Sequence, residues 1–295
     1  SMKSNFIKKN YLKKINKIQE HNNLYYNKSK PTITDQDYDI LKKEILELEN
    51  KFSFLRNNKS PSISIGYKPS KNFTKIKHKI PMLSLGNAFG EQDLENFEKK
   101  IFNFLSLKKS STIEYSAEPK IDGISASIIY INGKFTKGLS RGDGIEGEDI
   151  TLNLKTIKDI PNSIQAKNFP KEIDIRGEVF IENEDFKKIS SKFANPRNAA
   201  SGSLRQKNPN VTSKIPLKFI AYTYGYAMNM KINNQENFLK NLKLWGFKVN
   251  PFNKKITGVK NLILNHENLE KKRKEIEFDI DGIVYKVNNF DLQKR

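Results

Sequence analysis

The first fifty residues place apolar and polar positions at the spacing of two helices. Over residues 5–27 the apolar positions cluster on one side: Phe6, Ile7, Leu12, Ile15 and Ile18. A turn over residues 29–34 leads to a second helix that ends near Phe52, with the stripe Tyr38, Leu41, Ile45 and Leu48. Thr34 and Asp37 have the spacing of a capping box at its start. The pattern predicts a small helical hairpin, followed by a linker rich in Ser, Asn, Lys and Pro over 53–72.

From about residue 73 the pattern changes to that of short strands. Residues 124–131 and 134–140 flank an Asn-Gly pair, which predicts a tight hairpin. Residues 173–181 alternate well: Ile173, Ile175, Val179 and Ile181 face one way, and Asp174, Arg176 and Glu178 face the other. Further strands are predicted at 111–117, 219–228 and 278–287, and helices at 91–105, 236–245 and 259–275. This mixed order predicts an α+β fold with mainly antiparallel sheets, divided into a domain with its linker over 1–70 and a second domain over 71–295.

Composition narrows the classes of function. The formal net charge of +20 favours a polyanionic partner, although the abundance of Lys, Asn and Ile also fits an A+T-rich coding sequence. The chain has no cysteine, which excludes disulfides and thiolate metal sites within it, and its three histidines are far apart. No apolar run approaches the roughly 20 residues that span a bilayer, and no signal peptide is present. We therefore expect a cytoplasmic protein without a membrane partner.

One short segment carries the strongest chemical signal. Glu118-Pro119-Lys120-Ile121-Asp122-Gly123 lies between two predicted strands, so a lysine, an acid and a glycine are expected in a tight turn. The pattern Lys-x-Asp-Gly is the signature of covalent nucleotidyltransferases, in which the lysine becomes bonded to a nucleotide monophosphate. Lysine attacks phosphorus only as the neutral amine, so nearby positive charge from Lys286, Arg141 and Arg197 would favour loss of its proton.

Five further strings follow in the order found in NAD-dependent DNA ligases of the bacterial type. They are Ser140–Gly144 with Gly147–Asp149, Arg176–Phe180, Asn195–Ala200 with Gly202–Gln206, Phe219–Gly225, and Asp279–Val287. With them, the chain resembles the N-terminal adenylation part of that family, including its helical cap domain. The resemblance implies that 1–70 is the cap that binds nicotinamide mononucleotide (NMN), with its linker. It also implies that 71–295 is a nucleotidyltransferase (ATP-grasp-like ligase) domain that is truncated at its C-terminal end.

The resemblance implies a reaction. Lys120 attacks the α-phosphate of NAD, NMN leaves, and the lysyl-AMP product activates the 5′-phosphate of a nick in double-stranded DNA within the full-length enzyme. The catalytic residues implied are Lys120, Asp122, Arg141 and Lys286. Mg²⁺ is expected as a cofactor, with no protein ligand assigned to it, and the chain is expected to be monomeric. Because the family's last catalytic lysine and later domains would follow Arg295, we expect NAD binding and slow self-adenylation but poor joining of nicks.

The same resemblance assigns the binding residues. The NMN half of NAD would contact Tyr25, Tyr26, Asp35, Tyr38 and Asp39, and the adenylate half Ser84, Leu85, Glu118, Ile121, Glu178, Tyr222 and Asp281. Phosphates of the nucleotide or the nicked strand would contact Arg197 and Arg205. Two positions depart from the family: Tyr26 replaces the usual histidine, and Gly86 replaces the usual acid. Asp281 and Lys286 are five positions apart, so both can serve one site only if a bulge near Gly282, or a contact from the strand end, intervenes.

Simpler readings remain for the same residues. Lys120 would be an exposed turn lysine, Glu178 a solvent-facing acid and Tyr222 a core tyrosine, while Tyr25 and Tyr38 would only pack the hairpin. At the level of function, an ATP- or GTP-using nucleotidyltransferase shares the lysine motif. A basic nucleic-acid-binding module without chemistry would share the charge.

Overall fold

The computed structural model describes residues 1–24, 33–55, 73–83, 96, 99, 113–272 and 280–293. Several predictions concern positions outside these ranges: the candidate residues Tyr25, Tyr26, Ser84 and Leu85, the substitution at Gly86, residues 56–72 of the linker and most of the helix over 91–105. The backbone of Asp281 is described, but its side chain lies outside what the structure describes.

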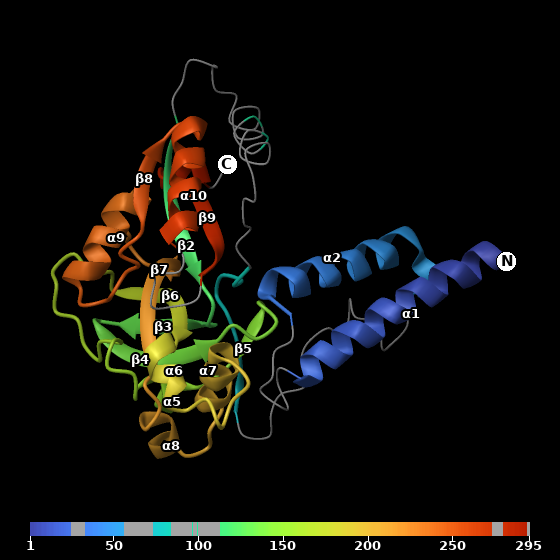
Figure 1. Ribbon diagram of the computed structural model, residues 1–295, viewed down its shortest axis with the longest axis horizontal. Helices are drawn as coiled ribbons and strands as arrows, with labels where there is room; N and C mark the ends of the chain where they lie inside the picture. Colours follow the sequence, from blue (N-terminus) through green and yellow to red (C-terminus); the bar gives the residue numbers. More distant parts are fainter. Residues whose placement is uncertain are drawn as a thin grey trace.

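The N-terminal part is a helical hairpin, as predicted. Helices α1 (Met2–Asn22) and α2 (Asp35–Lys51) lie side by side and extend away from the sheets, and a short 3-10 turn, η2 (Ser53–Leu55), follows (Figure 1). The hydroxyl of Thr34 accepts a hydrogen bond from the amide of Asp37 at 3.1 Å and caps α2. The two helices share a core made of Tyr11, Ile15, Ile18, Tyr38, Leu41, Ile45 and Leu55.

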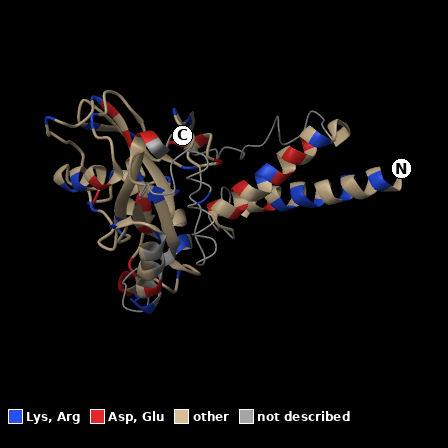
Figure 2. Cartoon of the chain, turned by 90° about the horizontal axis from the view of Figure 1, so that it is seen from above, with Lys and Arg blue, Asp and Glu red and all other residues tan. Residues whose placement is uncertain are grey.

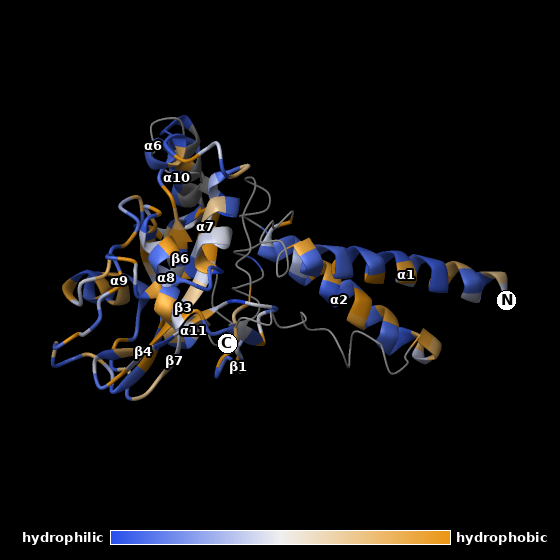
Figure 3. Ribbon diagram, turned by 90° about the horizontal axis from the view of Figure 1, so that it is seen from below, coloured by the Kyte–Doolittle hydropathy of each residue, from blue (hydrophilic) through white to orange (hydrophobic). Residues whose placement is uncertain are grey.

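Two residues that the pattern placed on the apolar side of α1 are not in this core. The side chains of Phe6 and Leu12 are 73% and 46% exposed. Because α1 packs mainly against α2 within the described ranges, a narrow stripe of it is covered, and the rest of the helix surface is mostly hydrophilic (Figure 3). The prediction was therefore wrong for these two residues, and the buried stripe runs through Tyr11 instead.

The second part contains a four-stranded antiparallel sheet in the order β4-β3-β6-β7. Its strands are β3 (Ile124–Ile131), β4 (Lys134–Ser140), β6 (Glu172–Phe180) and β7 (Lys218–Ala227). The predicted turn between β3 and β4 is present, with positive φ angles of 51° at Asn132 and 76° at Gly133. The inward-facing isoleucines and valine of β6 are fully buried, which confirms the predicted alternation.

A three-stranded antiparallel sheet carries the lysine motif. Its order is β8 (Lys254–Thr257), β2 (Glu114–Ile121) and β9 (Ile280–Val287), and β1 (Lys75–Lys77) pairs separately with β5 (Glu146–Glu148). Strand β2 continues through Lys120, so the lysine belongs to the strand and not, as predicted, to the turn after it. Opposite Lys120 the β2–β9 register shifts by one residue between the pairs Pro119–Ile283 and Ile121–Ile280. This shift confirms the predicted bulge near Gly282.

Short helices cover the sheets. They are α5 (Thr151–Leu154), α6 (Asn183–Lys187), α7 (Pro196–Leu204), α8 (Pro209–Ser213), α9 (Gln235–Leu244), α10 (Val259–Lys272) and α11 (Phe290–Gln293). Asn195 caps α7, and Gly246, with a φ of 100°, follows α9. All described strand pairings are antiparallel, so the predicted α+β class is confirmed. No helix in the described ranges is long and apolar enough to cross a bilayer.

Candidate active site

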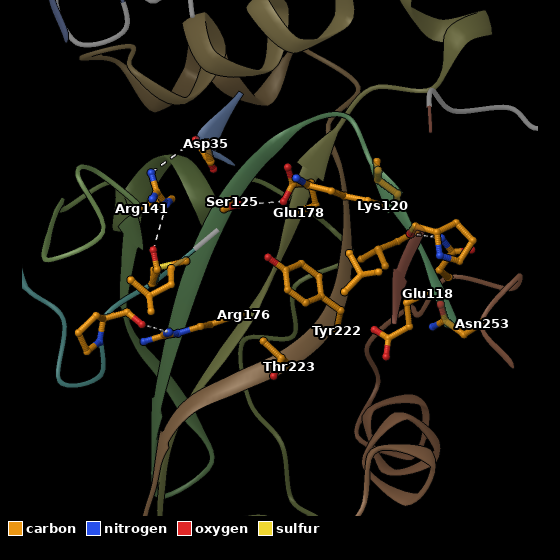
Figure 4. Close-up of a pocket in the computed structure, with 18 residues that line it drawn as sticks. Asp35, Glu118, Lys120, Ser125, Arg141, Arg176, Glu178, Tyr222, Thr223 and Asn253 are labelled. Atoms are coloured by element: carbon orange, nitrogen blue, oxygen red, sulfur yellow. Dashed lines mark hydrogen bonds and ion pairs between the residues drawn. The ribbon is translucent and has the colours of Figure 1, made fainter. Parts of the chain in front are cut away.

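A cavity of about 250 Å³ lies where the end of β2 meets β6, β7 and the segment over 81–83. The sequence-predicted residues that line it come from both parts of the chain: Asp35, Glu118, Lys120, Ile121, Arg141, Glu178 and Tyr222 (Figure 4). Asp35 is the first residue of α2, so the start of that helix contributes to the wall. The fold therefore brings together residues separated by almost 190 positions in the sequence.

Glu118 is the centre of a buried polar network at one end of the cavity. Its Oε1 accepts a hydrogen bond from Lys286 Nζ at 3.0 Å, and its Oε2 accepts from Ser116 at 2.8 Å and Gln235 at 3.0 Å. Gln235 also donates to the backbone carbonyl of Tyr222 at 2.8 Å. Three donors, one of them cationic, thus compensate a carboxylate that is 5% exposed. Glu118 is therefore a buried, fully bonded acid and not an exposed one at the end of a strand.

Tyr222 contributes an aromatic face to the same end. Its ring lines the cavity, and Lys286 Nζ lies 5.1 Å from the ring centroid. Burial raises the pKa of the Tyr222 hydroxyl, so the ring stays neutral. The side chain is only partly buried, which distinguishes it from the packed core tyrosine of the simpler reading. The ring offers a surface on which a planar base can stack.

Lys120 and Glu178 meet at the centre of the cavity. The side chain of Lys120 extends toward the Glu178 carboxylate (Figure 4). Glu178 accepts a hydrogen bond from Ser125 at 3.0 Å. Burial, with a smaller contribution from the charge of Asp35, raises the pKa of Glu178 to about 8. The polar face of β6 therefore lines an enclosed site, whereas the simpler reading placed it in solvent.

Arg141 connects α2 to the wall of the cavity. The guanidinium is 4% exposed, forms an ion pair with Asp39 and lies 3.6 Å from Asp35. Its Nε donates to the carbonyl of Met82 at 3.0 Å. His78 Nε2 lies 2.9 Å from the Arg141 carbonyl oxygen, and burial lowers the pKa of this imidazole. Arg141 is thus held at its guanidinium by Asp39 and Met82, and at its carbonyl oxygen by His78.

Arg197 makes a second connection to α2. Its guanidinium donates to the carbonyl of Ile33 at 3.0 Å and lies 3.9 Å from both Asp35 and Asp122. Asp122, which follows the strand end, is therefore linked to α2 through one arginine. The two arginines place positive charge on either side of Asp35, beside the cavity that holds Lys120.

Two candidate residues lie away from this cavity. Tyr38 packs in the hairpin core, where burial raises the pKa of its hydroxyl, as the simpler reading proposed. Arg205 forms an ion pair with the buried Glu148, and its guanidinium carbon lies 5.9 Å from the Phe73 ring centroid. Arg205 thus contacts β5 through Glu148 and lies against the ring of Phe73.

Comparison with known proteins agrees with this geometry. Residues 70–295 match the family model for the NAD-dependent DNA ligase adenylation domain, and residues 5–66 match that for the DNA ligase-like, N-terminal NAD+-binding domain. The chain belongs to the NAD-dependent DNA ligase family. A DNA ligase of Pelagibacter ubique is 75% identical over 97% of this chain, and one of Parvibaculum lavamentivorans is 43% identical over 94%.

The matched relatives are longer proteins. The chain spans 42% of the Pelagibacter ligase and 40% of the Parvibaculum ligase. Among solved structures, a chain named "Pmar-Lig_Pre." covers 84% of this chain and 47% of its own length. Its TM-score is 0.37 and its sequence identity is 14%, values too low to support a conclusion about this chain.

Several residues of the ligase site were not singled out from the sequence. Arg176 donates to the carbonyls of Ile80 and Pro81 and forms an ion pair with Asp174 at 3.2 Å, which fixes the wall segment. In the sequence, Arg176 stands out only as the first residue of the string Arg176–Phe180. Gln235 begins a helix far from the lysine motif, and no local signal links it to Glu118.

The part of the chain that the structure describes contains no group of three or more His, Cys, Asp or Glu able to hold a metal ion. Any Mg²⁺ bound with a nucleotide would thus depend on phosphate oxygens and water for most of its ligands.

Proposed function

We propose that this chain carries out the self-adenylation step of an NAD-dependent DNA ligase. Lys120 Nζ, after losing its proton, attacks the α-phosphate of NAD. A P–N bond forms as the bond between the α-phosphorus and the bridging oxygen breaks, and NMN leaves with that oxygen. The observation that carries the proposal is that Lys120, a nucleotide-sized cavity and an acid of the helical cap occupy one place.

The adenylate half of NAD fits the inner end of the cavity. Its base would stack on Tyr222, and its ribose hydroxyls would form hydrogen bonds with Glu178. A carboxylate accepts such bonds, and a protonated carboxyl group can also donate one. Lys286 and Ile121 would complete the wall near the base. Asp281 is proposed for the same end, where the bulge lies opposite Lys120.

The NMN half would lie toward the helical cap. Asp35 and Asp39 suit a positively charged nicotinamide ring, and Tyr25 and Tyr26 are proposed as its aromatic contacts. Arg141 is bound to these two acids in the structure, and we propose that NMN competes for them. Arg141, Arg197 and Lys286 would then stabilise negative charge on the phosphates, with Asp122 positioning Arg197.

The donor is proposed to be NAD because an acid of the cap lines the cavity, whereas ATP and GTP lack the positively charged nicotinamide ring that would suit this acid. Intact-protein mass spectrometry after incubation with Mg²⁺ and either NAD or ATP tests this. We expect the mass of one AMP to be added with NAD only, and removed again by excess NMN. An adduct with ATP only would place the chain in the other donor class.

In the full-length enzyme, AMP would pass from Lys120 to the 5′-phosphate of a nick in double-stranded DNA. The net charge of +20 suits such a polyanion. Lys and Arg lie on the helical hairpin and on the sheet domain alike, so charge alone selects no DNA-binding face (Figure 2). Phosphate contacts by Arg197 and Arg205, roles in replication and repair, a cytoplasmic location and a monomeric state stay predictions.

A further inference from the structure

Helix α1 concentrates positive charge that the proposed adenylation site does not use. It has one acid, Glu20, and the lysines Lys3, Lys8, Lys9, Lys13, Lys14 and Lys17. The neighbouring helix α2 has the opposite balance, with the acids Asp35, Asp37, Asp39, Glu44, Glu47 and Glu49 and the lysines Lys42, Lys43 and Lys51. Figure 2 shows this contrast along the hairpin. Because two adjacent helices of one chain differ so much, a general bias of composition toward lysine does not account for the charge of α1.

Three of the lysines of α1 form a row on its outer side. Lys9, Lys13 and Lys17 follow one another at intervals of four residues, so they lie on the same face of the helix. At 3.6 residues per turn, this face is opposite the buried stripe that packs against α2. All three are exposed, and the structure gives them no ion pair within the described part of the chain. Lys14, by contrast, pairs with Glu44 across the hairpin.

The row is electrostatically unfavourable in the chain by itself. Like charges four residues apart on a helix repel each other, and the row contains two such pairs. The effect extends to the next turn, because burial and then the charge of Lys17 lower the pKa of the His21 imidazole. A partner that brings negative charge would relieve this repulsion, so the row is suited to a polyanion.

The spacing of the row fits the backbone of duplex DNA. Four residues advance about 6 Å along a helix axis, so the row spans about 12 Å. One strand of B-form DNA rises about 3.4 Å per phosphate and therefore presents three or four phosphates over that length. Helix α1 also extends away from the sheets, as an arm that a duplex could lie along (Figure 1). An anionic bilayer fits less well, since an interfacial helix inserts its apolar face and the apolar stripe of α1 is buried against α2.

We propose that Lys9, Lys13 and Lys17 bind the phosphate backbone of double-stranded DNA, so that the helical cap contacts DNA as well as NAD. This inference rests on the proposed function only in taking the polyanion to be the DNA that the ligase joins. Contacts to phosphates position a protein on the duplex without reading its sequence. The row is separate from the adenylation chemistry, because none of the three lysines lines the cavity that holds Lys120.

Fluorescence anisotropy of a labelled nicked duplex, titrated with the whole chain between about 50 and 200 mM salt, tests the proposal. Each phosphate contact contributes about 0.9 to the slope of log affinity against log salt concentration. The triple variant Lys9→Gln, Lys13→Gln and Lys17→Gln should therefore have a slope that is shallower by about 2.7. Over this fourfold range of salt, the unmodified chain should lose on the order of 40-fold more affinity than the variant.

The matched control removes the same charge from the other helix of the hairpin. Lys42→Gln, Lys43→Gln and Lys51→Gln together lower the net charge by three, as the first triple variant does, but these lysines lie among the acids of α2. This control should leave the salt slope within about one of its original value. Equal effects of the two triple variants would show that net charge alone governs binding and would overturn the inference.

A charge reversal separates DNA binding from folding. Lys13→Glu replaces two repulsions in the row by attractions to Lys9 and Lys17, so the helical signal in far-UV circular dichroism should melt at the same temperature or higher. The same change sets a carboxylate against the phosphates, so DNA affinity should fall more than in Lys13→Gln. A variant with unaltered DNA affinity would contradict the inference.

The remaining outcomes separate this inference from the proposed function. A first triple variant that keeps its salt slope on DNA, including one that loses only its binding to vesicles of phosphatidylglycerol, would overturn the inference. Mass spectrometry after incubation with NAD and Mg²⁺ should still find AMP on this variant. If the unmodified chain binds DNA through the row but never acquires AMP, the proposed self-adenylation fails while the role of the row stands.

Discussion

Replacement of Arg176 by methionine should destabilise the sheet domain severely. Arg176 and Asp174 are each 6% exposed and their charged groups are 3.2 Å apart. Removing one partner of a buried ion pair leaves an uncompensated charge and costs about 3–5 kcal/mol. The substitution also leaves the carbonyls of Ile80 and Pro81 without their donor. We therefore expect the free energy of unfolding to fall by about 3–5 kcal/mol.

Urea unfolding followed by the fluorescence of Trp245 measures this loss, because Trp245 is buried in the sheet domain. The double variant Arg176→Met with Asp174→Asn is the matched control: it removes the stranded charge, so it should be more stable than Arg176→Met alone. Burial already raises the pKa of Asp174, and loss of the arginine should raise it further. The cost of Arg176→Met should therefore shrink as the pH falls and Asp174 takes up a proton. A loss below about 1 kcal/mol, or equal stability of single and double variants, would refute this reasoning.

Three further predictions concern β6 and the helical cap. Burial raises the pKa of Glu178 from 4.5 to about 8. The stabilising contribution of the protonated side chain is therefore complete below pH 4.5 and is lost as the pH rises through about 8. Glu178→Gln should flatten the pH dependence of the urea midpoint between these two values. A Cβ on Gly177 would overlap the carbonyl oxygen of Ile220, so Gly177→Ala should cost about 1–3 kcal/mol, measured as a lower melting temperature. Thr34→Ala removes the bond to Asp37 and should cost about 1 kcal/mol of helix stability, seen by far-UV circular dichroism; an unchanged melting curve would contradict the assigned cap.

Features fixed by neighbouring residues could be predicted from the sequence. The Asn132-Gly133 turn follows from residues that tolerate positive φ, and the helix caps at Thr34 and Asn195 follow from side chains that reach their own backbone. The alternation of β6 also identified its buried face, because period-two patterns survive wherever one face of a strand packs on a core.

Features that depend on distant segments could not be predicted in the same way. The simpler reading placed Glu178, on the polar face of β6, in solvent. On the same face, however, Arg176 is buried and donates to the carbonyls of Ile80 and Pro81, almost a hundred positions away. Strand β2 runs through Lys120 because β9 pairs with it there. Phe6 looked like a core residue, but its side chain is 73% exposed because no element of the described part of the chain covers that side of α1.

The residues of the candidate site show the same difference between local and distant determinants. The family motifs named Lys120, Glu118 and Tyr222, and the structure brings these three side chains to one cavity. Gln235 and Ser125, which donate hydrogen bonds to Glu118 and Glu178, carry no motif, because each lies far along the chain from the carboxylate that it binds.

The most direct test of the central claim is to locate the AMP adduct. The chain is incubated with NAD and Mg²⁺, digested with a protease and analysed by tandem mass spectrometry. The account predicts AMP on Lys120 alone among the 53 lysines and arginines, and no adduct in Lys120→Ala. AMP attached to another residue such as Lys286, or an adduct that survives in Lys120→Ala, would contradict it.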